Sequence, residues 1–398
     1  MNQYSEEKMQ DILRTWAEID LNALVDNFNN IKSIMNNNNK TIVVVKANAY
    51  GHGSIEVAKE LSEIADIFAT ATLEEATELR IRGIENEIMV LSPIPTGLFA
   101  NAIRYRVTPV LFNKEDADIM NEVASKISMP ANYYLAVDSG MSRIGIPCDE
   151  MGLETAQYIL SKENINCIGI ISHYACADSS NLESTYIQKQ KFDWLVSSLS
   201  EKYGELGTIS INNTAAVLQN LPTYNADRIG IALYGLYPSE YVKNAKISLK
   251  PVMTLKTRIS MVKTVKSGQG IGYGYTYITD SEKQVATLSA GYADGVPIEL
   301  SNKGKVIING KYAKILGRVC MDQFMVDVSE IDNVKAGDSA VIFGTDGKLS
   351  ITADEVADQA GILNYSLLCG IDSRVPRVYI KDNNIKKIFS YISFPYEW

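Results

Sequence analysis

The alternation of strand-like and helix-like segments up to residue 250 most restricts the fold that this chain can adopt. Eight runs rich in β-branched residues, mostly separated by helical patterns, cover residues 41–47, 66–72, 87–91, 107–112, 132–137, 167–172, 208–212 and 228–233. Strands that alternate with helices indicate parallel βα units, and eight such units predict an α/β fold of the (β/α)8 or TIM barrel type. A doubly wound open sheet shares this local pattern and is the alternative.

The pattern changes after Leu249-Lys250-Pro251. The chain then consists mostly of short β-branched runs separated by glycine turns, which predicts a second, mostly antiparallel β domain. We therefore expect a barrel domain over residues 14–248, a C-terminal β domain over residues 249–398 and a polar lead-in over residues 1–13. Between Thr15 and Met35 a helix is expected, with Asp20 as the candidate cap of its start. The apolar residues at helical spacing are Leu21, Leu24, Val25, Phe28, Ile31 and Ile34.

Composition excludes several classes of function. The formal net charge of −9 argues against nucleic-acid binding, which favours a basic surface. No apolar run approaches the roughly 20 residues of a membrane helix, and the N-terminus lacks the pattern of a signal peptide. Five scattered cysteines and two histidines indicate neither a disulfide framework nor a metal site. A cytoplasmic protein without a membrane partner is expected.

A lysine closes the first predicted strand. Lys46 follows the buried run from Thr41 to Val45 and precedes a glycine-bracketed loop. An amine at the mouth of an apolar core has a lowered pKa, which suits Schiff-base chemistry. The alternative is a lysine that extends to solvent.

Other polar residues follow the ends of the later strands. The fifth strand leads into Asp138–Arg143, the sixth ends at His173, the seventh leads into Asn213-Thr214, and Arg228–Ile231 opens the eighth. Because the active sites of TIM barrels lie at the C-terminal ends of the strands, this clustering predicts a site there.

These segments also resemble the motifs of a known family. The string VKANAYGHG at residues 45–53 closely resembles the motif around the pyridoxal-phosphate lysine of alanine racemases. Further strings similar to the family's lie, in the same order, at residues 138–145, 172–178, 227–235, 272–274, 291–295, 317–323, 365 and 374–377. The resemblance runs from about Trp16 to Tyr379.

The resemblance implies a pyridoxal 5'-phosphate site in the barrel. Lys46 would hold the cofactor as an aldimine, and Arg228 would face the pyridine nitrogen. The residues implied around the cofactor and its phosphate are Tyr50, His173, Asn213, Thr214, Gly230, Ile231 and Tyr365. Arg143 would bind the ring hydroxyl and the substrate carboxylate, a pairing that suits a guanidinium.

The resemblance also implies a two-base racemisation in a homodimer with shared active sites. Removing and returning a proton at an α-carbon needs one base on each face. Lys46 would serve one face and Tyr273 of the partner subunit the other, with His173 and Arg228 coupled to that tyrosine. Met321 and Asp322 of the partner subunit would line the substrate side.

Three positions depart from the family pattern. Ala136 stands where many members carry a carbamylated lysine that orients the arginine at Arg143. Ile298 replaces an arginine that usually lines the substrate entrance, and Thr214 replaces a serine. These departures argue against strict specificity for alanine.

The sequence thus predicts a racemase that interconverts L-alanine and D-alanine, the latter for peptidoglycan. The alternative within this fold is a serine or broad-specificity amino-acid racemase. A related pyridoxal-phosphate decarboxylase and a cofactor-binding protein without turnover are less consistent with Tyr273, which lies in the second domain.

Overall fold

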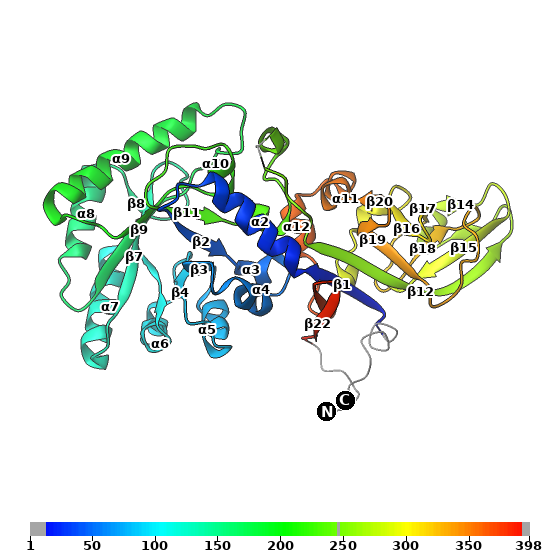
Figure 1. The fold of residues 1–398 in the computed structure, drawn as a ribbon, viewed down its shortest axis with the longest axis horizontal. Helices are drawn as coiled ribbons and strands as arrows, with labels where there is room; N and C mark the ends of the chain where they lie inside the picture. The colour runs from blue at the N-terminus through cyan, green and yellow to red at the C-terminus, as the bar shows by residue number, and fades with distance from the viewer. Residues whose placement is uncertain (1–12, 245–246, 392–398) are drawn as a thin grey trace. The chain divides into compact units, whose positions relative to one another are not determined.

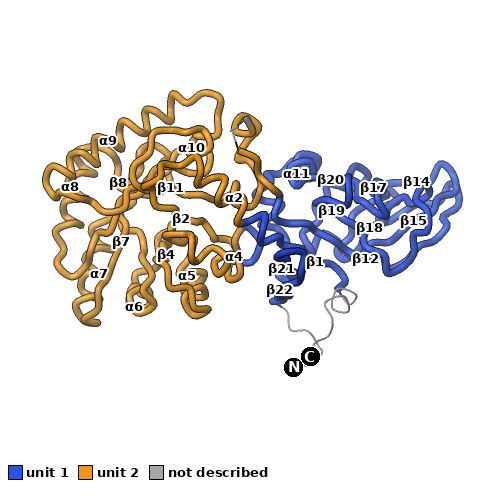
Figure 2. The backbone as a smooth tube through the Cα atoms, viewed as in Figure 1, with its two compact units in different colours: residues 1–24, 50–53, 251–398 blue, residues 25–49, 54–250 orange. Residues whose placement is uncertain are grey.

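The computed structural model describes residues 13–244 and 247–391. By internal contacts the chain divides into two compact units (Figure 2). Unit 1 contains the described residues up to Leu24, Tyr50–Gly53 and the chain from Pro251 onward. Unit 2 contains Val25–Ala49 and Ser54–Lys250. The predicted lead-in over residues 1–13 lies almost wholly outside the described residues.

The described part of unit 2 contains the eight strand positions of a barrel (Figure 1). The parallel strands follow two paths, β11-β2-β3-β4-β5 and β10-β9-β7-β6. β5 and β6 are consecutive pieces of one strand, interrupted at Pro109. The Arg228 backbone N–H donates to the Asn212 carbonyl over 3.2 Å and links the strand ends of β10 and β11. The predicted (β/α)8 barrel is confirmed.

The barrel strands coincide with the predicted runs to within a few residues. Their bounds are β2 Lys40–Val44, β3 Ile67–Thr70, β4 Glu87–Val90, β5 Val107–Thr108, β6 Val110–Leu111, β7 Asn132–Asp138, β9 Asn166–Ile171, β10 Thr208–Ser210 and β11 Ala226–Ile229. Ile42, Phe68, Leu135, Ile170 and Ile229 are completely buried. These apolar side chains supply the core of the barrel, as expected for parallel strands covered by helices.

Helices cover the outside of the barrel strands (Figure 1). They are α4 Ser54–Leu61, α5 Leu73–Ile81, α6 Phe99–Arg104, α7 Lys114–Ile127, α8 Glu150–Leu160, α9 Glu183–Tyr203 and α10 Thr214–Leu218. Side chains that accept a backbone N–H start three of the longer ones: Thr72 caps α5, Asn113 caps α7 and Asp149 caps α8. Local sequence thus sets where each helix begins.

Unit 1 is built on a mostly antiparallel sheet with the strand order β20-β19-β16-β17-β18-β15-β12-β1-β21-β22. The bounds are β12 Met253–Val265, β15 Lys283–Leu288, β16 Lys305–Ile308, β17 Lys311–Leu316, β18 Phe324–Asp327, β19 Ser339–Asp346, β20 Leu349–Ile351, β21 Arg377–Lys381 and β22 Asn384–Phe389. A hairpin of β13 Gly270–Ile271 and β14 Tyr277–Ile278 adds to the unit, as do α11 Ala353–Ala360 and α12 Asn364–Cys369. The predicted β domain is confirmed.

The start of the chain holds the expected helix, preceded by a strand that was not predicted. Thr15–Asp20 forms strand β1, which pairs antiparallel with β12 and parallel with β21. Helix α2, Leu21–Ile34, follows it, and Asp20 Oδ1 accepts the Ala23 backbone N–H at 2.9 Å, which confirms the predicted cap. Leu21 and Leu24 keep the helical spacing, but the strand before them is stabilised by partners more than 200 residues away, which local periodicity does not reveal.

The predicted limits of the two domains, 14–248 and 249–398, stay a prediction. By contacts, β1 belongs with the C-terminal sheet rather than with the barrel. No helix in the described residues is both long and apolar enough to cross a membrane.

Candidate active site

Lys46 follows β2 and opens a left-handed turn. The next residues, Ala47, Asn48 and Ala49, have φ between 51° and 54° and ψ between 45° and 51°. Such a conformation costs an L-residue about 1–2 kcal/mol. Hydrogen bonds hold the turn, because Glu75 Oε1 accepts the Ala47 N–H at 2.7 Å and Asn48 Oδ1 accepts the N–H that begins α4 at 3.0 Å. Strained backbone of this kind is characteristic of functional sites.

Arg228 and His173 lie next to each other at the C-terminal ends of β11 and β9. The Arg228 Nη2 atom is 3.1 Å from His173 Nδ1. A guanidinium only donates hydrogen bonds, so Nδ1 must accept, and the proton of a neutral imidazole resides on Nε2. Burial, together with the nearby charges of Arg228, Arg143 and Lys46, holds the pKa of His173 well below its usual value. His173 is therefore neutral and offers an Nε2–H donor.

The Arg228 guanidinium is buried among neutral acceptors. Nη1 donates to the Ser210 carbonyl and hydroxyl at 3.1 and 2.9 Å, and Nη2 donates to the Ser172 and Ile211 carbonyls. Burial lowers the pKa of Arg228 to about 10, so the group remains charged at neutral pH. Within residues 13–244 and 247–391 its Nε–H makes no hydrogen bond, which leaves this donor for a ligand.

Asn213 and Thr214 begin the short helix α10 beside this pair. Asn213 Oδ1 accepts the Ala216 N–H at 3.0 Å, and its amide nitrogen lies 3.4 Å from His173 Nε2. Thr214 Oγ1 accepts the Gly230 N–H at 2.7 Å, so the hydroxyl hydrogen remains available to another acceptor. Ile231 follows and begins the 3-10 turn Ile231–Tyr234.

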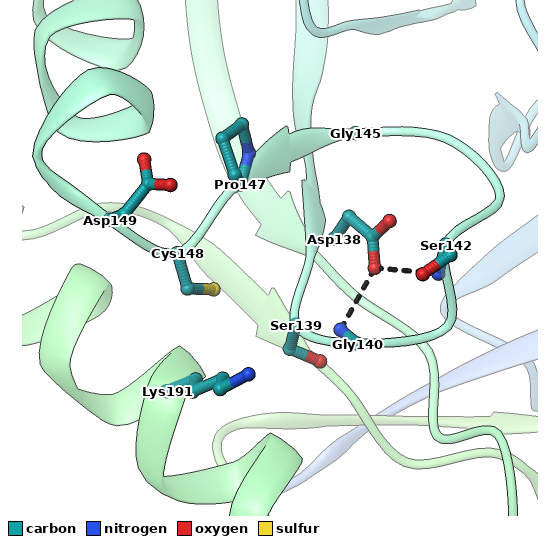
Figure 3. A pocket seen from close by; sticks show the side chains of 9 residues that line it. All are labelled: Asp138, Ser139, Gly140, Ser142, Gly145, Pro147, Cys148, Asp149 and Lys191. Atoms are coloured by element: carbon teal, nitrogen blue, oxygen red, sulfur yellow. Dashed lines mark hydrogen bonds between the residues drawn. The ribbon is translucent and has the colours of Figure 1, made fainter.

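Arg143 lies at the end of a loop that Asp138 organises. Asp138 Oδ1 accepts the backbone N–H groups of Gly140, Met141 and Ser142 at 2.8, 2.9 and 3.0 Å. Figure 3 shows the bonds to Gly140 and Ser142. Arg143 is exposed and makes no hydrogen bond or ion pair to any described residue. Ala136, on β7, is buried. No side chain of the described chain thus takes over the orienting role that the family assigns to a lysine at that position.

A cavity of about 380 Å³ lies against this loop (Figure 3). It is lined by Asp138, Ser139, Gly140, Ser142, Gly145, Pro147, Cys148, Asp149 and Lys191. Burial, with a smaller contribution from Asp138, raises the pKa of the Cys148 thiol to about 12. The thiol is therefore protonated at neutral pH and a poor nucleophile. None of the residues predicted to bind cofactor or substrate lines this cavity.

The two tyrosines predicted near the phosphate are neighbours within unit 1. The ring centres of Tyr50 and Tyr365 lie 6.0 Å apart. Tyr50 is buried, and burial together with the nearby Cys369 thiol raises the pKa of its phenol. Tyr50 is therefore a hydrogen-bond donor rather than a phenolate.

Asp322, a predicted substrate-side residue of unit 1, is tied to a buried carboxylate. Arg374 Nη2 donates to Asp322 Oδ1 at 2.8 Å, and Arg374 Nε donates to Asp294 Oδ1 at 2.8 Å. Asp294 is completely buried and also binds Arg14 and the Gly291 N–H. The two arginines neutralise this carboxylate and fix the strand connections on either side of it.

Tyr273 stands on a glycine-flanked turn between β13 and β14 in unit 1. Its side chain is 72% exposed. Gly272 has a φ of 72°, and a Cβ at this position would lie 3.0 Å from Met325 Cε and 3.4 Å from the Arg318 backbone nitrogen. A glycine therefore lets the turn pack closely while it presents Tyr273 to solvent.

The other exposed residues of interest in unit 1 are Met321 and Ile298, with exposed fractions of 52% and 45%. The sequence-predicted residues thus fall into two groups. Lys46, Arg143, His173, Asn213, Thr214, Arg228, Gly230 and Ile231 belong to unit 2, whereas Tyr50, Tyr273, Met321, Asp322 and Tyr365 belong to unit 1. Within the described chain, no group of three or more His, Cys, Asp and Glu side chains could hold a metal ion.

Comparison with known proteins agrees with this arrangement over nearly the whole chain. Residues 19–238 match the family model of the alanine racemase N-terminal domain, and residues 252–379 match that of the C-terminal domain. Alanine racemase 1 of Clostridium acetobutylicum is 41% identical over 381 residues, which cover 95% of this chain and 98% of the relative.

The chain belongs to the alanine racemase family.

Solved structures agree with this assignment. Alanine racemase of Clostridium difficile 630 superimposes with a TM-score of 0.92 at 37% identity, covering 96% of this chain and 100% of that one. A histidine racemase of Leuconostoc mesenteroides superimposes with a TM-score of 0.86 at 25% identity, covering 96% and 100% of the two chains. This member of the alanine racemase family is accordingly a racemase, which is an isomerase.

Two buried polar residues that contact predicted site residues or their partners, Gln188 and Asp294, were not among the residues predicted from sequence. Gln188 lies on α9 and is 3% exposed. It shares the buried face of that helix with Thr185, Phe192 and Leu195, so a polar residue at the apolar spacing 185–188–192–195 was the available signal. Asp294 lies in the family-like string at residues 291–295, where its type was visible but its partners were not.

Proposed function

We propose that this protein is an alanine racemase that interconverts L-alanine and D-alanine with pyridoxal 5'-phosphate on Lys46, and that it supplies D-alanine for peptidoglycan. The observation that carries the proposal is the His173–Arg228 pair. It presents one uncharged N–H donor and one guanidinium donor at the C-terminal ends of β9 and β11, and Lys46 follows the C-terminal end of β2. The relatives named above support alanine as the substrate.

The residues of unit 2 fit this cofactor. The Arg228 Nε–H has no acceptor among the described residues and suits a pyridine nitrogen, to which a guanidinium donates without giving up its proton. The Thr214 hydroxyl, whose oxygen already accepts the Gly230 N–H, can donate to a phosphate oxygen. We assign the phosphate to Thr214, Asn213 and the main chain at Gly230 and Ile231. Roles for Tyr50 and Tyr365 at the phosphate stay predictions.

When bound, pyridoxal phosphate supplies the electron sink that acidifies the α-C–H bond of an amino acid. Lys46 Nζ then takes or returns the α-proton on one face. The partner subunit's Tyr273 does the same on the other face, through its phenolic oxygen. Because Arg228 occupies His173 Nδ1, His173 would donate its Nε2–H to that phenolic oxygen and stabilise its negative charge. The imidazole remains neutral, since burial and the nearby guanidinium groups of Arg228 and Arg143 oppose its protonation.

A homodimer with shared sites is part of the proposal. Tyr273 and Met321 are both highly exposed in the single chain, and bulky side chains in such positions are typical of interfaces. Arg143 would bind the substrate carboxylate, because it makes no hydrogen bond to the described residues. The partner subunit's Met321 and the partner subunit's Asp322 would limit the space for the substrate side chain.

The substrate is tested by a chirality assay. Purified protein loaded with pyridoxal phosphate is offered L-alanine and L-serine separately, and formation of the D-enantiomer is measured. We expect rapid conversion of alanine and slow conversion of serine. Equal or faster conversion of serine would replace the proposal with the serine or broad-specificity alternative, which Ala136, Ile298 and the histidine racemase of the same fold make worth testing. Conversion of neither would contradict the function.

The second base is tested with Tyr273→Phe. Removing the hydroxyl leaves one face of the α-carbon without a base, so racemisation is expected to fall by about 10²–10⁴-fold. Cofactor absorbance should persist, because Tyr273 is not assigned to cofactor binding. Tyr275→Phe is the matched control, since Tyr275 lies on the same turn and is 69% exposed. Full activity of Tyr273→Phe in both directions would remove Tyr273 from the mechanism.

A further inference from the structure

Gln188 is a polar side chain on the buried face of an outer barrel helix. It lies in the second turn of α9 and is 3% exposed. Burying an amide is unfavourable unless its hydrogen-bonding groups are satisfied. Both ends of the Gln188 amide have partners, and all of those partners belong to the two loops that carry His173 and Arg143.

The amide holds the backbone on both sides of Tyr174. Gln188 Nε2 donates to the His173 carbonyl at 3.0 Å, and Gln188 Oε1 accepts the Ala175 N–H at 2.9 Å. From another direction, the Asn213 amide donates to the Tyr174 carbonyl at 3.3 Å. The segment 173–175 is thus held at three consecutive residues, which restricts the direction in which the His173 side chain leaves the backbone.

The same amide reaches the loop that leads to Arg143. Gln188 Nε2 lies 3.3 Å from the Ser139 hydroxyl, which is itself 2.9 Å from the Ser172 hydroxyl. A Cβ on Gly140 would come within 3.3 Å of Gln188 Cγ, and Gly140 has a φ of 138°. Glycine at this position therefore permits the close approach of loop and helix.

We propose that Gln188 is a positioning residue of the racemase site, which sets the orientation of the His173 imidazole so that Nδ1 meets Arg228 and Nε2–H faces the reaction. The expected effect on catalysis rests on the proposed function, whereas the effect on the orientation of His173 does not. Gln188 contacts only the main chain of His173, so it acts through the orientation of that residue. Its link to Ser139 also holds the Arg143 loop in register with the His173 segment.

The test uses the histidine content of the chain. The sequence has two histidines, His52 and His173, so the full-length protein labelled with ¹⁵N-histidine and loaded with cofactor gives two imidazole spin systems. Their ¹⁵N shifts distinguish protonated from unprotonated ring nitrogens, and His52→Gln assigns them. We expect native His173 to be the Nε2–H tautomer and Gln188→Met to give a mixture of tautomers. Gln190→Met, an exposed glutamine on the same helix, should leave both spin systems unchanged.

Kinetics supply the second readout. A reacting group displaced by about 1 Å can cost about a hundredfold in rate, so we expect kcat of Gln188→Met to fall by about that factor while KM changes much less. A merely structural role would lower the amount of folded protein without changing the tautomer or separating kcat from KM. Native-like tautomer and kcat in folded Gln188→Met would overturn the proposal.

Gln188→Glu keeps the test decisive if Gln188→Met does not fold. A protonated carboxyl retains one donor and one acceptor, enough for the His173 carbonyl and the Ala175 N–H, whereas a carboxylate has only acceptors. The His173 tautomer of this variant should therefore be native-like at low pH and mixed at high pH. Arg228, Arg143 and Lys46 also act on His173. Because these groups are present in the native protein as well, the native spectrum at each pH is the reference for the variant. A native-like tautomer at both ends of the pH range would contradict the inference.

These outcomes separate the inference from the proposed function. The tautomer is measured without substrate, so a protein that racemises neither alanine nor serine would still show whether Gln188 orients His173. Conversely, if the protein racemises alanine but its His173 signals are unchanged by the Gln188 substitutions, the proposed function would stand and the inference would be wrong.

Discussion

Asp294 is fully buried and binds two arginines, and it illustrates how a single residue holds a loop in place. Its carboxylate accepts from Arg14, from Arg374 Nε at 2.8 Å and from the Gly291 N–H at 2.8 Å. Arg374 extends the network to Asp322. Because a carboxylate without partners is very unfavourable in the protein interior, all of these contacts must form together, and the loop at Asp322 acquires one position.

Asp294→Asn is expected to destabilise the protein by about 3 kcal/mol, since it leaves two neighbouring guanidinium groups without their shared anion. Urea or thermal unfolding measures the change, and KM for the amino acid should rise because Arg374 no longer holds Asp322 in place. Asp332→Asn is the control, because Asp332 is 89% exposed and pairs with Lys311 at 3.5 Å. Its effect should stay within about 0.5 kcal/mol. Equal stability of the two variants would refute the role of Asp294.

At the scale of elements, the turn after β2 is the unusual feature. A right-handed helix would be the normal continuation of a βα unit, but Ala47, Asn48 and Ala49 adopt the left-handed region. Glu75 Oε1 and the start of α4 hold this turn from both sides. This left-handed turn places Lys46 at a sharp bend directly at the end of its strand. In a right-handed helix, the same residue would pack against the next helical turn.

Ala47→Gly is expected to stabilise the protein by about 0.5–1 kcal/mol. Glycine adopts a positive φ without the Cβ penalty, and this gain exceeds the extra entropy of the unfolded chain. Ala100→Gly, within the right-handed helix α6, should instead destabilise by about 0.5–1 kcal/mol. Thermal melting of both variants beside the native protein gives the comparison, and a lower melting temperature for Ala47→Gly would show that the turn is not strained.

Elements were predictable from sequence to different degrees. The barrel strands and the strands after Pro251 followed from β-branched runs and glycine turns, because those patterns reflect burial within a few neighbouring residues. The residues of β1 did not, since Thr15 and Ile19 are held by Thr257 and Met253 of β12. The helix after it was predictable, because the apolar residues at helical spacing begin at Leu21 and Asp20 caps its start, but that spacing carries no information about the strand before it.

At the scale of the whole chain, two units with different architectures each carry part of the predicted site. The barrel unit contains the lysine, the histidine–arginine pair and the proposed phosphate donors. The β unit contains Tyr273 on its exposed turn and the Asp294 network. This division is consistent with the family models, which also match the chain in two parts, and with the proposal that a second subunit supplies the second base.

The sequence by itself determined the architecture and the family, and it supplied the residues predicted for the site. Strand and helix patterns depend on local burial, and the motifs around Lys46, Arg228 and Tyr273 are contiguous strings, so both can be recognised without coordinates. The tertiary structure alone decided the Nε2–H tautomer of His173, the network of Asp294 and the position of Gln188. Each of these depends on contacts between residues far apart in the chain, which form only when the barrel and the sheet have folded.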